Sequence, residues 1–178
     1  PEPHPEFRLW LSASPSNQFP ITILQRGIKM TTEPPRGLRA NMLTLYNLVS
    51  EEQFARCGQQ FKYKKLLFAL SFFHAVILQR RKFGAIGWNI AYQWMTSDLN
   101  FAQANLKLFL DEQPNVPWVA LNVIISDVIY GGRVTDKQDV RLTRAILGIY
   151  LHPDCLTNPT YSYCPSLDAA FRYAAPPE

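Results

Sequence analysis

The side chains in this sequence that are suited to catalysis or metal binding are few and scattered. The three histidines are His4, His74 and His152, and the first and last stand beside prolines at opposite ends of the chain. This spacing argues against a metal site built from histidines. The chain also has neither a GxxxxGK[ST] phosphate loop nor a GxGxxG turn. We therefore expect no bound nucleotide, metal or other cofactor in this segment.

The three cysteines, Cys57, Cys155 and Cys164, are odd in number, widely spaced and outside any CxxC pair. That pattern argues against a disulfide framework and a four-ligand zinc site, and it favours reduced thiols in a cytosolic protein. None of the three stands in a motif that supplies a base to a nucleophile. We therefore expect no catalytic residue here.

His74 lies within the apolar run from Leu66 to Leu78. It is either a proton shuttle or ligand, or a core histidine bonded to a carbonyl or a neighbouring side chain. The second interpretation is favoured, because no other His or Cys lies within helical reach. Cations flank this run at 62–65 and 80–82. These cations could bind phosphate or an acidic partner, or they could be the solvated ends of a buried helix. We favour the second interpretation.

The segment Tyr130–Asp136 resembles a binding loop at first sight. Its glycines and its Thr-Asp pair are, however, what a helix end, a turn and the next helix start require. Arg133 and Arg141 then remain to pair with Asp136, with Asp139 or with a neighbouring domain.

Composition excludes several classes of protein. The 178 residues are 47% hydrophobic and 18% charged, which is enough apolar material for a core in one domain or one domain with an appendage. A net charge of +4 is too small to predict binding to nucleic acid unless the basic residues cluster on one surface. The longest apolar run, 66–78, is shorter than the roughly 20 residues that cross a bilayer. We expect neither a nucleic-acid nor a membrane partner.

Alternation of apolar residues predicts short strands near the N-terminus. Phe7, Leu9 and Leu11 share one face of 7–12, and two further apolar stretches follow at 21–24 and 27–31, of which we expect at least one to be a strand. Three such strands do not form a sheet of their own. We expect them to be the edge of a truncated α/β domain that continues upstream, since the chain starts without Met and both ends look cut.

From Pro35 onward the apolar period is close to 3.6 and predicts a helical bundle. A capping box at Ser50–Gln53 opens a short helix, Ser97–Asp98 and Asp136 cap later ones, and Pro117 begins another. The central helix, 63–82, is apolar almost all round. After residue 152 no period remains, and we expect a loop or linker docked by its rings. The predicted fold is mainly α, with parts at 1–33, 34–151 and 152–178.

Several stretches taken together resemble the dynein heavy chain near its C-terminal end. They occur in the family's order and cover residues 4 to about 165. The residues of the stretches 29–41 and 87–90 are closer to those of axonemal than of cytoplasmic heavy chains. The stretches are His4–Ser12, Phe19–Gln25, Lys29–Asn41, Lys65–Ala75, Arg80–Gly84, Gly87–Ile90, Ser97–Leu99 and Tyr130–Asp136.

The resemblance implies the end of the large part of the sixth AAA+ module, followed by its helical lid and a linker toward a C-terminal domain. In the family this module does not hydrolyse ATP, while the parent chain is an ATP-driven microtubule motor. The implied partners are neighbouring AAA+ modules, the C-terminal domain and, through the parent, dynein subunits and microtubules. The implied location is the cytoskeleton, in the axoneme of a cilium or flagellum.

The sequence departs from the family pattern at a few positions. Gln79 replaces a usual Glu, Ala85 and Ala91 replace prolines, and 136–141 keeps only part of the motif Asp-Trp-Asp-Arg-Arg. These changes bear on a salt bridge from residue 79, on the rigidity of the 85–91 loop and on an aromatic contact at 138.

We therefore hypothesise that the segment transmits force and carries out no chemistry. The alternative is a stand-alone helical adaptor that binds a protein partner through aromatic loops. A third possibility, an enzyme with an unrecognised site, has no support beyond a few isolated histidines. The residues predicted to matter are structural: a core of Phe68, Phe72 and Phe73 with His74, and loops that meet neighbours, held by Trp88, Trp94, Arg133, Asp136 and Arg141.

Overall fold

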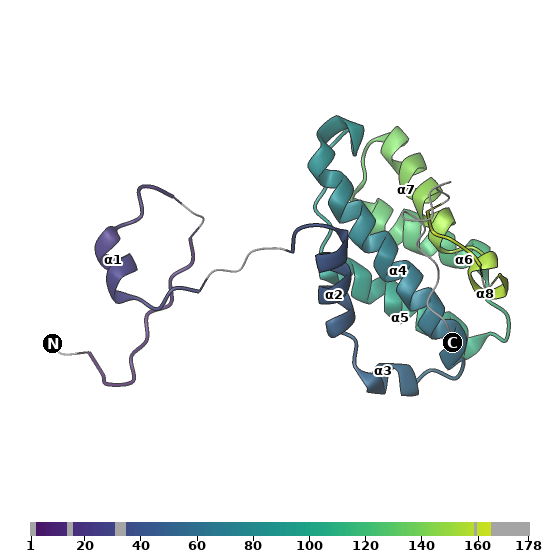
Figure 1. The fold of residues 1–178 in the computed structure, drawn as a ribbon, viewed down its shortest axis with the longest axis horizontal. Helices are drawn as coiled ribbons and strands as arrows, with labels where there is room; N and C mark the ends of the chain where they lie inside the picture. The colour runs from purple at the N-terminus through teal and green to yellow at the C-terminus, as the bar shows by residue number, and fades with distance from the viewer. Residues whose placement is uncertain (1–2, 14–15, 31–34, 159, 165–178) are drawn as a thin grey trace. The chain divides into compact units, whose positions relative to one another are not determined.

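The computed structural model describes residues 3–13, 16–30, 35–158 and 160–164. The chain divides into two compact units, Pro1–Pro34 and Pro35–Glu178. Each unit is described by itself below, with the elements labelled as in Figure 1.

The N-terminal unit contains one short helix, α1 (Ile21–Arg26), and irregular chain. The predicted strands at 7–12, 21–24 and 27–31 are wrong within residues 3–13 and 16–30, where no strand forms; Thr31 lies outside the described residues. Stretch 21–24 is helical because its amides bond locally, with Ile23 and Leu24 both donating to the Pro20 carbonyl. A strand needs bonds to a neighbouring strand, and the described residues of this unit provide none.

The second unit is the helical bundle that the sequence predicts. Its elements in chain order are α2 (Leu38–Asn47), α3 (Glu51–Ala55), α4 (Gln60–Arg80), the 3₁₀ helix η1 (Arg81–Ile86), α5 (Thr96–Glu112), α6 (Trp118–Val123), the π-helix η2 (Ile124–Tyr130), the 3₁₀ turn η3 (Gly131–Arg133), α7 (Lys137–Tyr150) and α8 (Asp154–Thr157).

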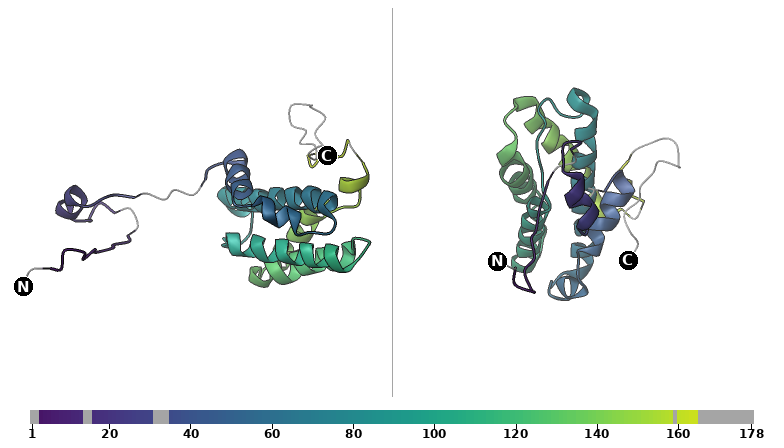
Figure 2. Two further views of the ribbon diagram at one scale, coloured as in Figure 1. Left: turned by 90° about the horizontal axis from the view of Figure 1, so that it is seen from below. Right: turned by 90° about the vertical axis from the view of Figure 1, so that its left-hand side faces the viewer.

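Helix α4 is the centre of this bundle and contacts α2, α5, α7 and α8 (Figure 1). Figure 2 shows α5 running alongside it. Its apolar residues lie on every side, so several of them, including Leu66, Leu70 and Ile77, are fully buried. Burial of this kind contributes about 1.5–3 kcal/mol for each large aliphatic side chain. The helix gives way to η1, in which Gly84 adopts a φ of 54° that other residues rarely take.

The predicted helix starts are largely confirmed. Ser50 and Gln53 form the capping box that opens α3, and the Asp136 carboxylate accepts bonds from the amides of Gln138 and Asp139 at the start of α7. The start of α5 differs from the prediction by about two residues. Thr96 is its first residue, so Asp98 stands in its first turn and accepts from the Met95 amide at 2.8 Å.

The sequence predicts a helix that begins at Pro117 and ends at Gly131-Gly132, and in the structure the helical geometry changes along this segment. Helix α6 widens into the π-helix η2 and then tightens into η3. Gly131 permits the wide turn, because a Cβ at this position would lie 2.4 Å from the Ser126 carbonyl oxygen. A π-turn inside a helix is rare and is frequently found at functional sites.

The chain after α7 returns to the bundle and is held there by its rings, as predicted, but residues 154–157 form the short helix α8 where a loop was expected. Tyr163 is 2% exposed, and its ring centroid lies 5.7 Å from that of Phe72 and 5.5 Å from that of Tyr150. Cys155 on α8 is fully buried in the same core. Residues 165–178 of the predicted linker lie outside the described residues.

Candidate functional site

Within the described ranges, no three or more His, Cys, Asp or Glu side chains gather closely enough to bind a metal ion. Among the same residues, no helix has the length and hydropathy of a membrane span. The features that remain are a cluster of aromatic and charged side chains around the loop at 87–95 and a groove beside α5.

The loop at 87–95, here called the aromatic loop, turns its large rings inward. Trp88 donates through Nε1 to the Ile77 carbonyl of α4 at 3.2 Å, and Trp94 donates to the Tyr130 carbonyl at 3.3 Å. The two indole rings lie 4.8 Å apart, and both are 3% exposed. The rings anchor the loop to the end of α4 and to η2, while Asn89, Ile90 and Gln93 between them stay exposed.

Two carboxylates at the start of α7 hold the same loop. Asp139 is buried and accepts from the amides of Asn89 (3.0 Å) and Ile90 (3.3 Å). Asp136 accepts from the Asn89 side chain at 3.1 Å, and this bond is the main cause that lowers the pKa of its carboxyl. The role of Asp139 was missed by sequence reasoning, which offered it only as a partner for an arginine.

Arg133 pairs with neither of the carboxylates named for it. Its Nη2 lies 3.0 Å from Oδ1 of Asp98, whose side chain is 7% exposed, and its Nη1 donates to the Gln93 carbonyl. Folding brings Asp98 from the first turn of α5 to this position, so the pair joins η3 to α5. Arg141 is exposed on α7 and forms no ion pair within the part of the chain that the structure describes.

His74 is a core histidine, as the sequence indicates. It is 1% exposed, and its Nδ1 lies 3.0 Å from the hydroxyl of Tyr130. Burial disfavours the charged ring and lowers the pKa of His74 to about 4. Burial likewise raises the pKa of Tyr130. The neutral pair joins α4 to η2 and carries no charge at neutral pH.

The predicted core phenylalanines lie on α4 at different depths. Phe73 is fully buried with its ring edge against Tyr130, at a centroid distance of 5.0 Å. Phe72 is 6% exposed and Phe68 is half-buried, and both contact Tyr163. These rings join α4, η2 and the returning chain into one core.

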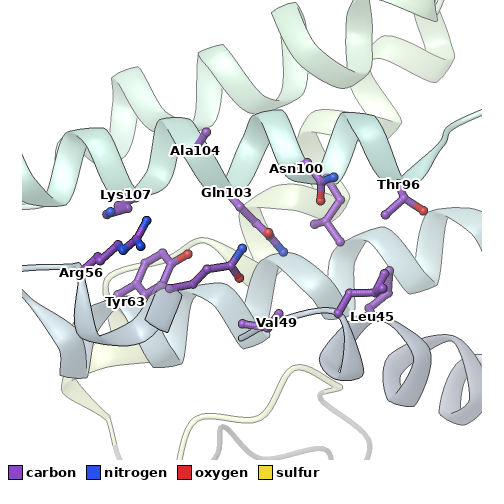
Figure 3. Close-up of a pocket in the computed structure, with 12 residues that line it drawn as sticks. Leu45, Val49, Arg56, Tyr63, Thr96, Asn100, Gln103, Ala104 and Lys107 are labelled. Atoms are coloured by element: carbon purple, nitrogen blue, oxygen red, sulfur yellow. The ribbon is translucent and has the colours of Figure 1, made fainter. Parts of the chain in front are cut away.

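A groove of about 620 Å³ lies beside α5 (Figure 3). Arg56 and Lys107 stand near Tyr63 at one end, while Asn100 and Gln103 line the α5 wall. No motif marks this groove, but polar residues of α5 recur at 96, 100, 103 and 107, a spacing that places them on one helical face. The groove is lined by Leu45, Leu48, Val49, Gln53, Arg56, Tyr63, Thr96, Leu99, Asn100, Gln103, Ala104 and Lys107.

Comparison with known proteins agrees with this architecture. The family described as "Dynein heavy chain AAA lid domain" matches residues 63–178, and "Dynein heavy chain region D6 P-loop domain" matches residues 1–31. The chain is 52% identical over 164 residues to Dynein-1-beta heavy chain, flagellar inner arm I1 complex, of Chlamydomonas reinhardtii. It is 53% identical over 160 residues to Dynein axonemal heavy chain 2 and 44% identical over 179 residues to Dynein axonemal heavy chain 12, both of Mus musculus.

These matches cover 92%, 90% and 98% of this chain, but only 4%, 4% and 6% of the respective relatives. The chain thus spans a small part of the length of the proteins it matches. Because the lid family matches more than half of the chain and the bundle has the predicted helical architecture, this chain belongs to the dynein heavy chain family.

Proposed function

We propose that residues 1–178 form a non-catalytic lid segment of the sixth AAA+ module in an axonemal dynein heavy chain. The parent would be an ATP-driven, microtubule-based motor of cilia or flagella, and this segment would pass conformational change around the motor ring. The names of the relatives, which include a flagellar inner-arm heavy chain and axonemal heavy chains, support this assignment and do not favour a stand-alone adaptor.

The observation that carries the mechanical part of the proposal is the packing of α4. This helix contacts α2, α5, α7 and α8, and its fully buried side chains leave little free space for sliding. The aromatic loop is fixed to the same body by Asp139 and by two indole hydrogen bonds. A displacement applied to one surface would therefore move the whole bundle.

The proposed partners follow from the same assignment. The segment would meet neighbouring AAA+ modules and the C-terminal domain of its own chain, and it would reach other dynein subunits and microtubules only through the parent. We place no cofactor and no catalytic residue in it. Hydrolysis of ATP would belong to other modules of the parent.

The first test is the size of the native protein. An antibody against this segment should detect, in source cells, a band far larger than 20.4 kDa that is enriched in isolated axonemes. A band near 20.4 kDa in the soluble fraction would refute the proposal that the segment works inside a full-length motor and would favour the stand-alone adaptor.

The second test addresses transmission. In the complete heavy chain, Asp139→Asn should loosen the aromatic loop, because the charge-assisted bonds to the Asn89 and Ile90 amides become weaker neutral ones. The change also replaces one of the two acceptor oxygens that face the Asn89 amide with an NH₂ donor. We expect faster hydrogen exchange at the Asn89 and Ile90 amides and a several-fold loss of microtubule-stimulated ATPase, with basal ATPase retained. Asp154→Asn makes the same chemical change at an exposed carboxylate and serves as the control. Unchanged stimulation in a variant whose loop exchanges faster would refute the proposed role.

A further inference from the structure

Four cations gather at the end of the bundle where α4 finishes and α7 begins. Arg81 and Lys82 lie on η1, Lys137 and Arg141 lie on α7, and all four are exposed. Figures 1 and 2 both show η1 and the start of α7 at this end. Asn89, three residues beyond the end of η1, donates to Asp136 and Asp139 and so ties the chain that follows η1 to the start of α7. We call these four cations the basic end.

The carboxylates nearest to the basic end are already engaged. Asp139 is 2% exposed and faces the backbone amides of the aromatic loop, and Asp136 caps α7 and binds Asn89. Over the described ranges, none of the four cations forms an ion pair with a carboxylate. Both carboxylates keep their negative charge, because their hydrogen bonds come from neutral N–H groups, so four cations stand against two carboxylates and an excess of positive charge remains at this end.

Two of these charges stand where the helix itself disfavours them. Lys137 is the first residue of α7, at the positive end of the helix dipole. Arg141 follows at i+4 on the same face, where like charges repel. Local helix stability does not account for cations at these positions, whereas a partner of opposite charge would.

The same end exposes large apolar side chains. On η1, Phe83 is 60% exposed and Ile86 is 89% exposed. A free phosphate would leave both in water. A bilayer would meet two apolar side chains on a short turn, whereas membrane-surface segments present the apolar face of a long amphipathic helix. A polypeptide that carries both carboxylates and apolar side chains could contact the cations of the basic end and also cover Phe83 and Ile86.

Resting on the proposed function, we infer that the basic end docks an acidic polypeptide segment from the part of the heavy chain outside residues 1–178. The matched relatives are long enough to supply it, since this chain covers only 4% of the Chlamydomonas heavy chain. A segment of the same polypeptide also has a high effective concentration at this surface. Its Asp or Glu residues would face Lys82 and Lys137, and its apolar side chains would cover Phe83 and Ile86.

Carbodiimide cross-linking of the native motor tests this contact directly, because it joins a lysine amine to a carboxylate with no spacer. Mass spectrometry should find Lys82 or Lys137 joined to Asp or Glu of a segment outside residues 1–178. The yield should fall several-fold at high salt. Lys64, an exposed lysine at the opposite end of α4, serves as the internal control and should show no such link.

Charge reversal sharpens the test. Arg81→Glu with Arg141→Glu leaves both reporter lysines in place and should lower their cross-linking at least fivefold. Arg39→Glu, at an exposed arginine of α2, should leave it unchanged. Phe83→Ser should also lower the yield, while Phe101→Ser, at a phenylalanine 63% exposed on α5, should not.

The docking inference is overturned if Lys82 and Lys137 form no such links while other lysines of the motor do. It is also overturned if the cross-linking yield at these lysines is unchanged in the charge-reversal variant. It is also overturned if the basic end binds anionic vesicles or inorganic phosphate and no carboxylate segment. These results are separable from a failure of the proposed function. Cross-links found together with unchanged stimulation in Asp139→Asn would support docking and refute transmission.

Discussion

Gly131→Ala is the change whose effect the structure defines most sharply. The new Cβ would lie 2.4 Å from the Ser126 carbonyl oxygen and 3.3 Å from the carbonyl carbon. An ordinary contact needs about 1 Å more than the shorter distance. Ser126 and Ile125 are buried, so this part of η2 has little room to shift. We expect a loss of about 1–3 kcal/mol, the usual cost of overpacking a core.

The neighbouring residue is a matched control. A Cβ at Gly132 would meet nothing within 4 Å, and its backbone is not left-handed. Gly132→Ala should therefore leave stability unchanged or raise it by up to about 1 kcal/mol, since alanine restricts the unfolded chain more than glycine does.

Thermal and urea unfolding of the two variants, followed by circular dichroism, separates the outcomes. For a unit of this size, Gly131→Ala should lower Tm by roughly 3–10 °C relative to Gly132→Ala. Equal Tm values for the two variants would show that the wide π-turn is not needed, and the explanation of η2 given above would be wrong.

Three further changes probe the core. The pKa of His74 is about 4 in the folded chain, against an ordinary value of 6.5, so between these pH values only the unfolded chain binds a proton at this residue. The free energy of unfolding should therefore fall by up to about 3 kcal/mol as the pH is lowered through that window. In unfolding measurements at several pH values, His74→Gln should lose this pH dependence. Phe72→Asp buries an unpaired carboxylate and should lower the unfolding free energy by several kcal/mol, so an unchanged Tm would contradict the place of Phe72 in the core. Arg133→Met removes the partner of the buried Asp98 carboxylate and should cost about 1–3 kcal/mol in urea unfolding, whereas no change would mean that the ion pair does not matter.

The central helix was predictable from sequence because its signal is local and dense. The apolar residues of 63–82 fill almost every face, which excludes a surface helix, and α4 occupies 60–80. The Asp136 cap was predictable for a similar reason, since the carboxylate acts on amides two and three residues away.

Features that depend on distant parts of the chain were not predictable. The stretch 21–24 has the apolar character of a strand, but a strand is decided by its neighbours, and local bonds to Pro20 prevail here. The partner of Arg133 lies 35 positions away, so only the packing of η3 on α5 selects Asp98 over Asp136. The groove beside α5 likewise exists only after α2, α3 and α5 have all packed against α4.

The return of the chain after α8 gives the bundle a mechanical connection that its long helices do not provide. The Tyr163 ring stacks on Phe72 of α4 and on Tyr150 at the end of α7. A pull on the polypeptide beyond residue 164 would therefore reach the central helix through stacked rings, without first unwinding α7. For the same reason, a fragment that stops at α7 would leave the faces of Phe72 and Tyr150 in water and would tend to self-associate.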